Sequence, residues 1–150
     1  MKTFNSIAEF EKVVGTHLGY SDWHMVTQEQ IDLFAEATGD RQWIHTDPGK
    51  AAEGPFGTTI AHGYLTLSLI PALVGQIYDV EGVRVKINYG SEKVRFPSPV
   101  PVGSRIRAGA ELLGVTRGAG GTRATVRVTV EREGSPKPAC VAETVLMMVT

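Results

Sequence analysis

Residues 63–78 read GYLTLSLIPALVGQIY, and this stretch decides the fold. Its leucine, isoleucine and valine side chains fall on nearly every side of a helix, so the spacing predicts a long helix from Gly63 to about Tyr78 that is buried all round. Pro71 lies inside this helix, where it removes one backbone hydrogen bond and bends the axis. A helix of this kind needs a protein layer wrapped around it.

The same region resembles a membrane span, because residues 60–77 are mostly apolar and about as long as a bilayer crossing requires. Polar and helix-breaking residues interrupt it, namely His62, Ser68, Pro71, Gly75 and Gln76. The strand-like sequence downstream also needs a central element to cover. We therefore expect no membrane span and predict a helix inside a globular fold.

The second half of the chain is rich in strand patterns. Expected strands cover residues 83–88, 91–96, 104–115, 122–133 and 138–149, and Gly118-Ala119-Gly120-Gly121 is an expected hairpin turn. Apolar and polar residues alternate most clearly at Ala124, Val126, Val128 and Val130. Long strands joined by tight turns predict an antiparallel meander, and together with the helical first half they indicate the α+β class.

The first half carries helix signals and loops. We expect a short helix within residues 5–14, an extended segment over 18–26 and a turn of helix around 50–53. Thr27 and Gln30 have capping-box spacing before an amphipathic helix, and Gly39 is a typical helix stop. Asp40 therefore follows a helix end, where loops on a rigid support often carry function.

The composition is that of one ordinary globular domain, residues 1–150, with 42% hydrophobic and 21% charged residues. The net charge of −1 gives no electrostatic reason to bind nucleic acid. A single cysteine, Cys140, cannot form an internal disulfide, and the polar start of the chain has no apolar leader segment. We therefore expect a cytoplasmic protein.

The residues that point to chemistry are Asp40 and His45. Each alone is ordinary, since an aspartate after a helix forms turns and a loop histidine usually makes structural hydrogen bonds. As a pair in a tight loop, a carboxylate and an imidazole can share one water or hydroxyl, one accepting a proton while the other donates. The spacing predicts that both side chains point into one cavity.

His62 and Gly63 open the predicted central helix. The first N–H groups of a helix have no intrahelical partner, and a glycine lets a ligand oxygen approach them closely. A thioester oxygen that gains negative charge would be stabilised there. The alternative, an ordinary helix-start glycine preceded by a histidine without a functional role, stays open.

The spacing of His24, His45 and His62 matches no compact metal motif, so we expect no metal.

The stretch from Ala37 to Pro48, ATGDRQWIHTDP, followed by Ile60-Ala61-His62-Gly63, resembles the MaoC-like or R-specific enoyl-CoA hydratase (hydratase 2) family. The later residues 94–103, VRFPSPVPVG, resemble the family's strand-to-turn segment, so the likeness runs over nearly the whole chain. The resemblance implies a hot-dog fold, an antiparallel sheet wrapped around one long helix, which normally pairs into a homodimer with a continuous sheet.

The resemblance also implies an activity and residue roles. The activity is the reversible syn addition of water to a trans-2-enoyl-CoA, which gives an (R)-3-hydroxyacyl-CoA. Asp40 and His45 would be the catalytic pair that activates the water, and the Gly63 N–H would bind the thioester carbonyl, beside His62. The substrate would be an acyl-CoA or an acyl-carrier-protein thioester, with no separate cofactor.

The chain departs from the family pattern at two neighbouring positions. Gln42 stands where the family has asparagine, and Trp43 stands where it has proline. Both would border the substrate, so the departures bear on acyl-chain preference more than on reaction type. Pro71 replaces a serine often found eight residues after the helix-start glycine, so no role is carried over to it.

Two rival functions remain at the level of sequence. An acyl-CoA thioesterase of the same fold usually needs a carboxylate on the central helix, and residues 64–76 contain none. A non-catalytic, acyl-binding partner subunit of a heterodimeric dehydratase would be expected to lack the Asp40–His45 pair. Both rivals are separated from a hydratase by the activity of the isolated chain.

Overall fold

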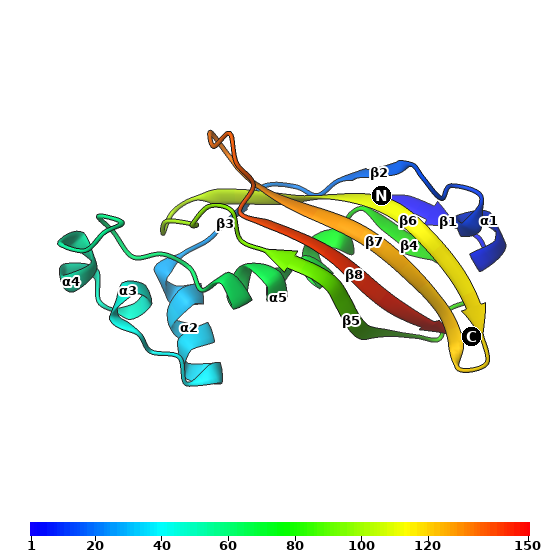
Figure 1. Ribbon diagram of the computed structural model, residues 1–150, viewed down its shortest axis with the longest axis horizontal. Helices are drawn as coiled ribbons and strands as arrows, with labels where there is room; N and C mark the ends of the chain where they lie inside the picture. The colour runs from blue at the N-terminus through cyan, green and yellow to red at the C-terminus, as the bar shows by residue number, and fades with distance from the viewer.

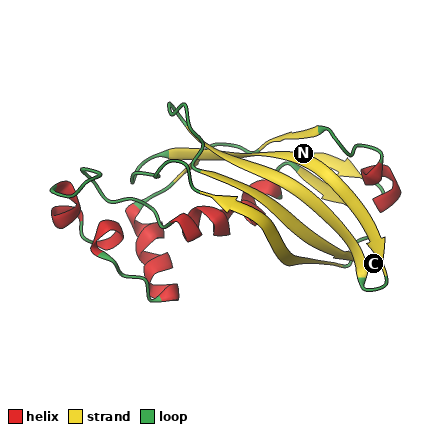
Figure 2. Cartoon of the chain, viewed as in Figure 1, coloured by secondary structure: helices red, strands yellow, loops and turns green.

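A computed structural model describes all residues, 1–150. Helices α2 to α4 extend past one end of a curved sheet, α5 lies along the sheet and α1 lies near its other end (Figures 1 and 2). The helices are α1 (Ile7–Glu11), α2 (Gln28–Thr38), α3 (Trp43–Thr46), α4 (Pro48–Ala52) and α5 (Gly63–Val74). The strands are β1 (Lys2–Phe4), β2 (His17–Tyr20), β3 (His24–Met25), β4 (Tyr78–Val80), β5 (Val85–Arg95), β6 (Arg105–Gly118), β7 (Gly121–Arg132) and β8 (Cys140–Val149).

The main sheet is antiparallel and runs in the order β2-β6-β7-β8-β5, with β3 also paired to β6. Strands β6, β7 and β8 form the predicted meander. The predicted alternation is confirmed, since Ala124, Val126, Val128 and Val130 of β7 are all buried. The sheet curves over α5, which lies along its concave side (Figure 1). This is the arrangement that the hot-dog resemblance implies.

The central helix is shorter and less enclosed than the sequence predicts. It ends at Val74, and the chain then turns so that β4 pairs in parallel with β1. One face is buried against the sheet, while the other leaves Tyr64, Ser68 and Pro71 exposed. The expectation of burial all round is therefore wrong for a single chain, because its one sheet covers only one side of the helix.

Two strand predictions are corrected by the structure. The strands expected over 83–88 and 91–96 form one strand, β5 (Val85–Arg95), because irregularities between Asn88 and Gly90 and between Ser91 and Val94 bend the strand without ending it. The expected extended segment over 18–26 is divided into β2 and β3, both on β6. Strands β1 and β4 are three residues each and too short to leave a periodic signal.

The boundaries of α2, beside the candidate site, lie at the capping residues that the sequence predicts. Thr27 caps α2 by accepting a hydrogen bond from the Gln30 N–H, and Gly39 ends α2 in the left-handed conformation at φ +82°. The predicted short helix after residue 5 is α1, and the predicted turn near residue 50 is α4, which starts earlier because Asp47 caps it. No helix is both long and apolar enough to cross a bilayer.

The hairpin between β6 and β7 depends on a glycine. Gly121 has φ +137°, and a Cβ at this position would lie 2.7 Å from the Met148 carbonyl oxygen. We expect Gly121→Ala to lower the free energy of unfolding by about 1–3 kcal/mol, because it adds backbone strain and a clash in the sheet. Gly120→Ala is the matched control, since its Cβ would meet nothing within 4 Å. Urea denaturation at one protein concentration measures both, and equal stability of the two variants would contradict the assignment.

Candidate functional site

The candidate site lies where α5 begins, beside the group of helices α2 to α4 that extends past the end of the sheet (Figure 1). The left-handed turn at Gly39 redirects the chain after α2, so Asp40 is exposed at the start of a loop. His45 follows in the single turn of α3, where it is buried at 7% exposure. The loop therefore offers an accessible carboxylate next to an imidazole shielded from water.

His62 joins this pair from the opposite side of the site. Its ring stacks on His45 with a centroid separation of 3.8 Å, and Phe34 of α2 lies 4.9 Å from it. Ligand-capable atoms of Asp40, His45 and His62 all lie within 4.8 Å of one another. The structure thus brings together the two residues that the sequence pairs, and it adds His62.

The hydrogen bonds of the two histidines define their tautomers. His45 Nδ1 lies 2.7 Å from the Ile60 carbonyl oxygen, and His62 Nε2 lies 2.9 Å from the Asp40 carbonyl oxygen. A carbonyl oxygen only accepts, so each of these nitrogens carries the proton. His45 Nε2 is therefore a bare acceptor in the neutral ring. His62 Nδ1 is also bare, and it is buried without a hydrogen-bond partner.

The surroundings keep His45 neutral. Burial lowers the pKa of His45 below its usual 6.5, the hydrogen bond to Ile60 raises it, nearby His62 lowers it, and the Asp40 charge raises it. Burial is the largest of these effects. A neutral imidazole with a bare Nε2 beside a carboxylate is suited to accept a proton.

Gln28 is a residue of the site that the sequence analysis missed. Its Nε2 donates to the His45 carbonyl oxygen at 2.8 Å, and its Oε1 accepts a hydrogen bond from the buried Thr59 hydroxyl. It therefore ties α2 both to the His45 turn and to the segment whose Ile60 carbonyl holds the His45 ring. These bonds span 17 and 31 residues, and no local pattern in the sequence indicates them.

Gly63 begins α5, and no side chain caps the helix start. A Cβ on Gly63 would lie 3.3 Å from the ring of Phe96, which comes from the end of β5. Because Gly63 has no side chain, the Phe96 ring packs directly against the first residue of α5. The first N–H groups of α5 are available to a ligand oxygen in this position.

The two residues that depart from the family pattern, Gln42 and Trp43, have different surroundings. Gln42 is exposed at the start of α3, with its N–H 3.4 Å from Asp40 Oδ1. The indole of Trp43 turns toward α4, where it packs against Gly54 and lies under the Lys50 ammonium at 4.9 Å. The structure therefore brings Gln42 to Asp40, whereas the packing contacts of Trp43 are with α4 and the residues that follow it.

The cluster of Asp40 and two histidines raises the question of a metal ion. The His45 and His62 rings are stacked with 24° between their planes. Because the rings are stacked, an ion in the plane of one imidazole would lie out of the plane of the other, so both nitrogens could not bind it along their in-plane lone pairs. His24 lies apart and interacts with Gln30. A site that works without metal stays our prediction.

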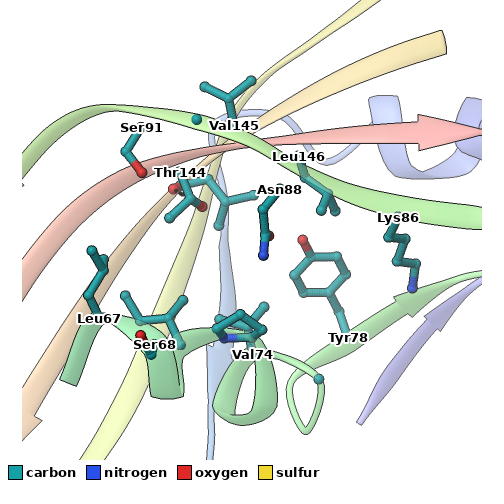
Figure 3. Close-up of a pocket in the computed structure, with 15 residues that line it drawn as sticks. Leu67, Ser68, Val74, Tyr78, Lys86, Asn88, Ser91, Thr144, Val145 and Leu146 are labelled. Carbon is teal, nitrogen blue, oxygen red and sulfur yellow. Dashed lines mark hydrogen bonds between the residues drawn. The ribbon is translucent and has the colours of Figure 1, made fainter. Parts of the chain in front are cut away.

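A cavity of about 590 Å³ runs along α5 from Leu67 toward its C-terminal end. Residues of α5, β4, β5, β7 and β8 line it, as Figure 3 shows. Leu67, its lining residue nearest to the site along α5, lies one turn of helix beyond Gly63. Its volume is within the range of small-molecule sites.

Comparisons with known proteins agree with this geometry. Residues 9–134 match the family model described as a MaoC like domain. The chain is 59% identical over 150 residues to 3-hydroxyacyl-thioester dehydratase Z of Mycobacterium tuberculosis, with 99% of each protein covered. It is 46% identical over 140 residues to nodulation protein N of Rhizobium leguminosarum bv. viciae, covering 91% of this chain and 87% of the relative.

A solved structure gives the same fold. The (R)-hydratase from A. caviae involved in PHA biosynthesis has a TM-score of 0.75 to this chain at 26% identity, and the match covers 91% of this chain and 96% of that one.

Fold and site together define a hot-dog protein with an acid–base cluster at the start of its central helix. The chain belongs to the MaoC-like dehydratase family. The resemblance found in the sequence is thereby confirmed, and so is the expected class of enzyme, a hydro-lyase of the hydratase and dehydratase type. The roles of individual residues stay predictions.

The titration of His45 tests the electrostatics of the site. We expect NMR of the imidazole to give His45 a pKa below 6.5, so neutral His45 is present above this range and is lost as the pH falls. Asp40→Asn should lower the pKa further, because it removes the charge that favours the imidazolium. Asp22→Asn, an exposed aspartate outside the cluster, is the control. A wild-type pKa at or above 6.5 would count against the shielded site.

Proposed function

We propose that this protein catalyses the reversible addition of water to trans-2-enoyl-CoA, which gives (R)-3-hydroxyacyl-CoA, with Asp40 and His45 as the catalytic pair. The observation that carries this proposal is the bare, neutral Nε2 of His45 beside the Asp40 carboxylate at the open start of α5. Family membership and the names of the relatives support it, since several are dehydratases of 3-hydroxyacyl compounds. The unit that acts is the whole of residues 1–150.

The reaction uses both members of the pair on one water. His45 Nε2 removes a proton from the water as its oxygen bonds to the β-carbon, and Asp40 accepts a hydrogen bond from the remaining O–H. The imidazolium that forms is stabilised by the Asp40 charge and returns its proton to the α-carbon on the same face. The net change is addition of H and OH, so no oxidant, reductant or separate cofactor is needed.

The negative charge of the intermediate develops on the thioester oxygen. The Gly63 N–H binds this oxygen, and the start of α5 favours negative charge there. His62 fixes the position of Asp40 through its hydrogen bond to the Asp40 carbonyl oxygen. Gln42 and the part of the Trp43 side chain that α4 leaves exposed contact the substrate, and the acyl chain follows the cavity along α5.

The net charge of the chain and the state of its cysteine support a cytoplasmic enzyme that binds thioesters in solution. The net charge of −1 favours neither nucleic acid nor an anionic surface. Burial raises the pKa of the Cys140 thiol to about 11, so this lone cysteine stays protonated and unreactive. An acyl-carrier-protein thioester carries the same reacting atoms as the CoA thioester and is the alternative substrate.

A homodimer is part of the proposal. Strand β5 is a free edge of the sheet, and along it Ile87 and Tyr89 are 48% and 57% exposed. A long apolar edge strand is a template for pairing with another chain. We infer that β5 pairs with its copy in a second subunit, which would also bring cover to the exposed face of α5.

The catalytic pair is tested by substitution. Asp40→Asn and His45→Gln should each lower kcat for hydration of crotonyl-CoA and octenoyl-CoA by about 10²–10⁴-fold, because each removes a group that handles the proton. Asp22→Asn and His24→Gln are matched controls outside the pair and should stay near wild type. Near-full activity of both pair variants would refute the assignment. A wild type that cleaved acyl-CoA thioesters without hydrating any enoyl-CoA would instead be a thioesterase.

The dimer is tested by light scattering after size-exclusion chromatography. Wild type should run at twice the 16.2 kDa of one chain, and Ile87→Lys should shift it toward the monomer by placing charges along the paired edge. Val14→Lys adds the same charge at an exposed apolar residue outside β5 and α5, so it should stay dimeric. A wild-type mass of one chain would exclude the proposed pairing. An isolated chain that became active only with a second protein would indicate a heterodimer instead.

A further inference from the structure

Strand β5 presents polar residues toward the inside of the fold. Cross-strand neighbours share a face of a sheet, and Lys86 lies opposite the buried Met148 while Asn88 lies opposite Leu146. The inner face of β7, in contrast, carries four buried apolar residues in succession, Ala124, Val126, Val128 and Val130. The alternation of β5 is thus the reverse of what packing alone would select, since its apolar residues face outward.

A second polar group reaches the same space from β4. The ring of Tyr78 is 6% exposed and stacks on Phe10 at 5.2 Å, yet its hydroxyl points into the cavity, as does the side chain of Asn88 (Figure 3). No hydrogen bond joins these two groups to each other or to the other side chains that line the cavity. Burial raises the pKa of Tyr78 to about 12, so the hydroxyl remains a donor.

The charges at this end of the cavity are already paired. Lys86 forms an ion pair with Asp79, so the wall carries no free cation for an anionic ligand. What remains is a neutral hydroxyl and a neutral amide that are able to donate and accept hydrogen bonds. The matching ligand group is therefore neutral and polar.

A plain alkyl chain would suit this space poorly. It would remove the Tyr78 hydroxyl and the exposed Asn88 amide from water without offering them a partner, which is unfavourable for polar groups. An oxygen-bearing chain of the same length would satisfy them. At a rise of about 1.5 Å per residue, the end of α5 at Val74 lies roughly 16 Å from Gly63 along the helix axis, so these groups meet the tail of an acyl chain and not its thioester.

We propose that the acyl group taken by this site carries a neutral oxygen function, a hydroxyl or keto group, on its tail, and that Tyr78 and Asn88 bind it. The inference rests on the proposed function for the position of the thioester at Gly63. It makes Tyr78 and Asn88 determinants of specificity that leave the chemical step unchanged.

Binding tests this without relying on catalysis. Calorimetry should show that the dimeric wild type binds saturated tetradecanoyl-CoA with a terminal hydroxyl about tenfold more tightly than tetradecanoyl-CoA itself, a difference typical of one well-made buried hydrogen bond. Tyr78→Phe keeps the ring and should abolish the preference. Tyr89→Phe is the control, because its hydroxyl bonds to Arg123 instead of entering the cavity.

Hydration provides the second measurement. We would measure kcat/KM for dodecenoyl-, tetradecenoyl- and hexadecenoyl-CoA, each with and without a terminal hydroxyl. At one of these lengths wild type should favour the hydroxylated member, and Tyr78→Phe should remove that preference. Equal binding of all pairs by wild type would overturn the inference. An equal loss for plain and hydroxylated chains in Tyr78→Phe would also overturn it, since Tyr78 would then contact the pantetheine arm. A binding preference without any hydration would overturn the proposed function and leave this inference standing.

Discussion

Burial of one face of α5 against the concave side of the sheet is the constraint on which the other features depend. The helix turns Leu65, Ile70 and Leu73 inward, and the strands facing it carry small buried residues such as Ala110 and Ala124. Small side chains on the sheet leave room for large ones on the helix, so this face of the helix packs closely on the sheet. Once α5 packs against the sheet, the positions of His62 and Gly63 at its start are determined. The start of α5 is therefore the rigid part of the site.

The site lies between the rigid start of α5 and a loop that has few buried side chains. Asp40 and His45 belong to the loop, whereas His62 and the Ile60 carbonyl belong to the segment that pairs with Pro101 near the sheet. Hydrogen bonds and a stacked pair of imidazoles join the two parts. Gln28 adds a tie from α2, so the backbone at His45 is fixed from one side and its ring from the other. Polar contacts of this kind are directional, and they set the tautomer as well as the position of the base.

Much of the fold could be read from local patterns. Alternation in β7, the cap at Thr27 and the stop at Gly39 act over a few residues, and each appears in the structure as predicted. The extent of α5 and the continuity of β5 could not be read, because apolar spacing does not tell which side of a helix a sheet will cover or whether a bulge ends a strand. The pairing of Asp40 with His45 followed from their closeness in sequence. The contacts of Gln28 with His45 and Thr59 did not, because only the folded chain brings those residues together.

In β5, a change in ligand preference is separable from a change in stability, two effects that are usually linked in a core strand. Core strands such as β7 cannot vary without altering packing, since both neighbours and the helix press on every inward side chain. Within one chain, strand β5 has a neighbour on one side only, and Lys86 and Asn88 line a cavity. Replacing one of these residues alters the shape and polarity of that cavity while the core keeps its contacts. Evolution can therefore adjust ligand preference at β5 independently of stability, much as an exposed loop does in other folds.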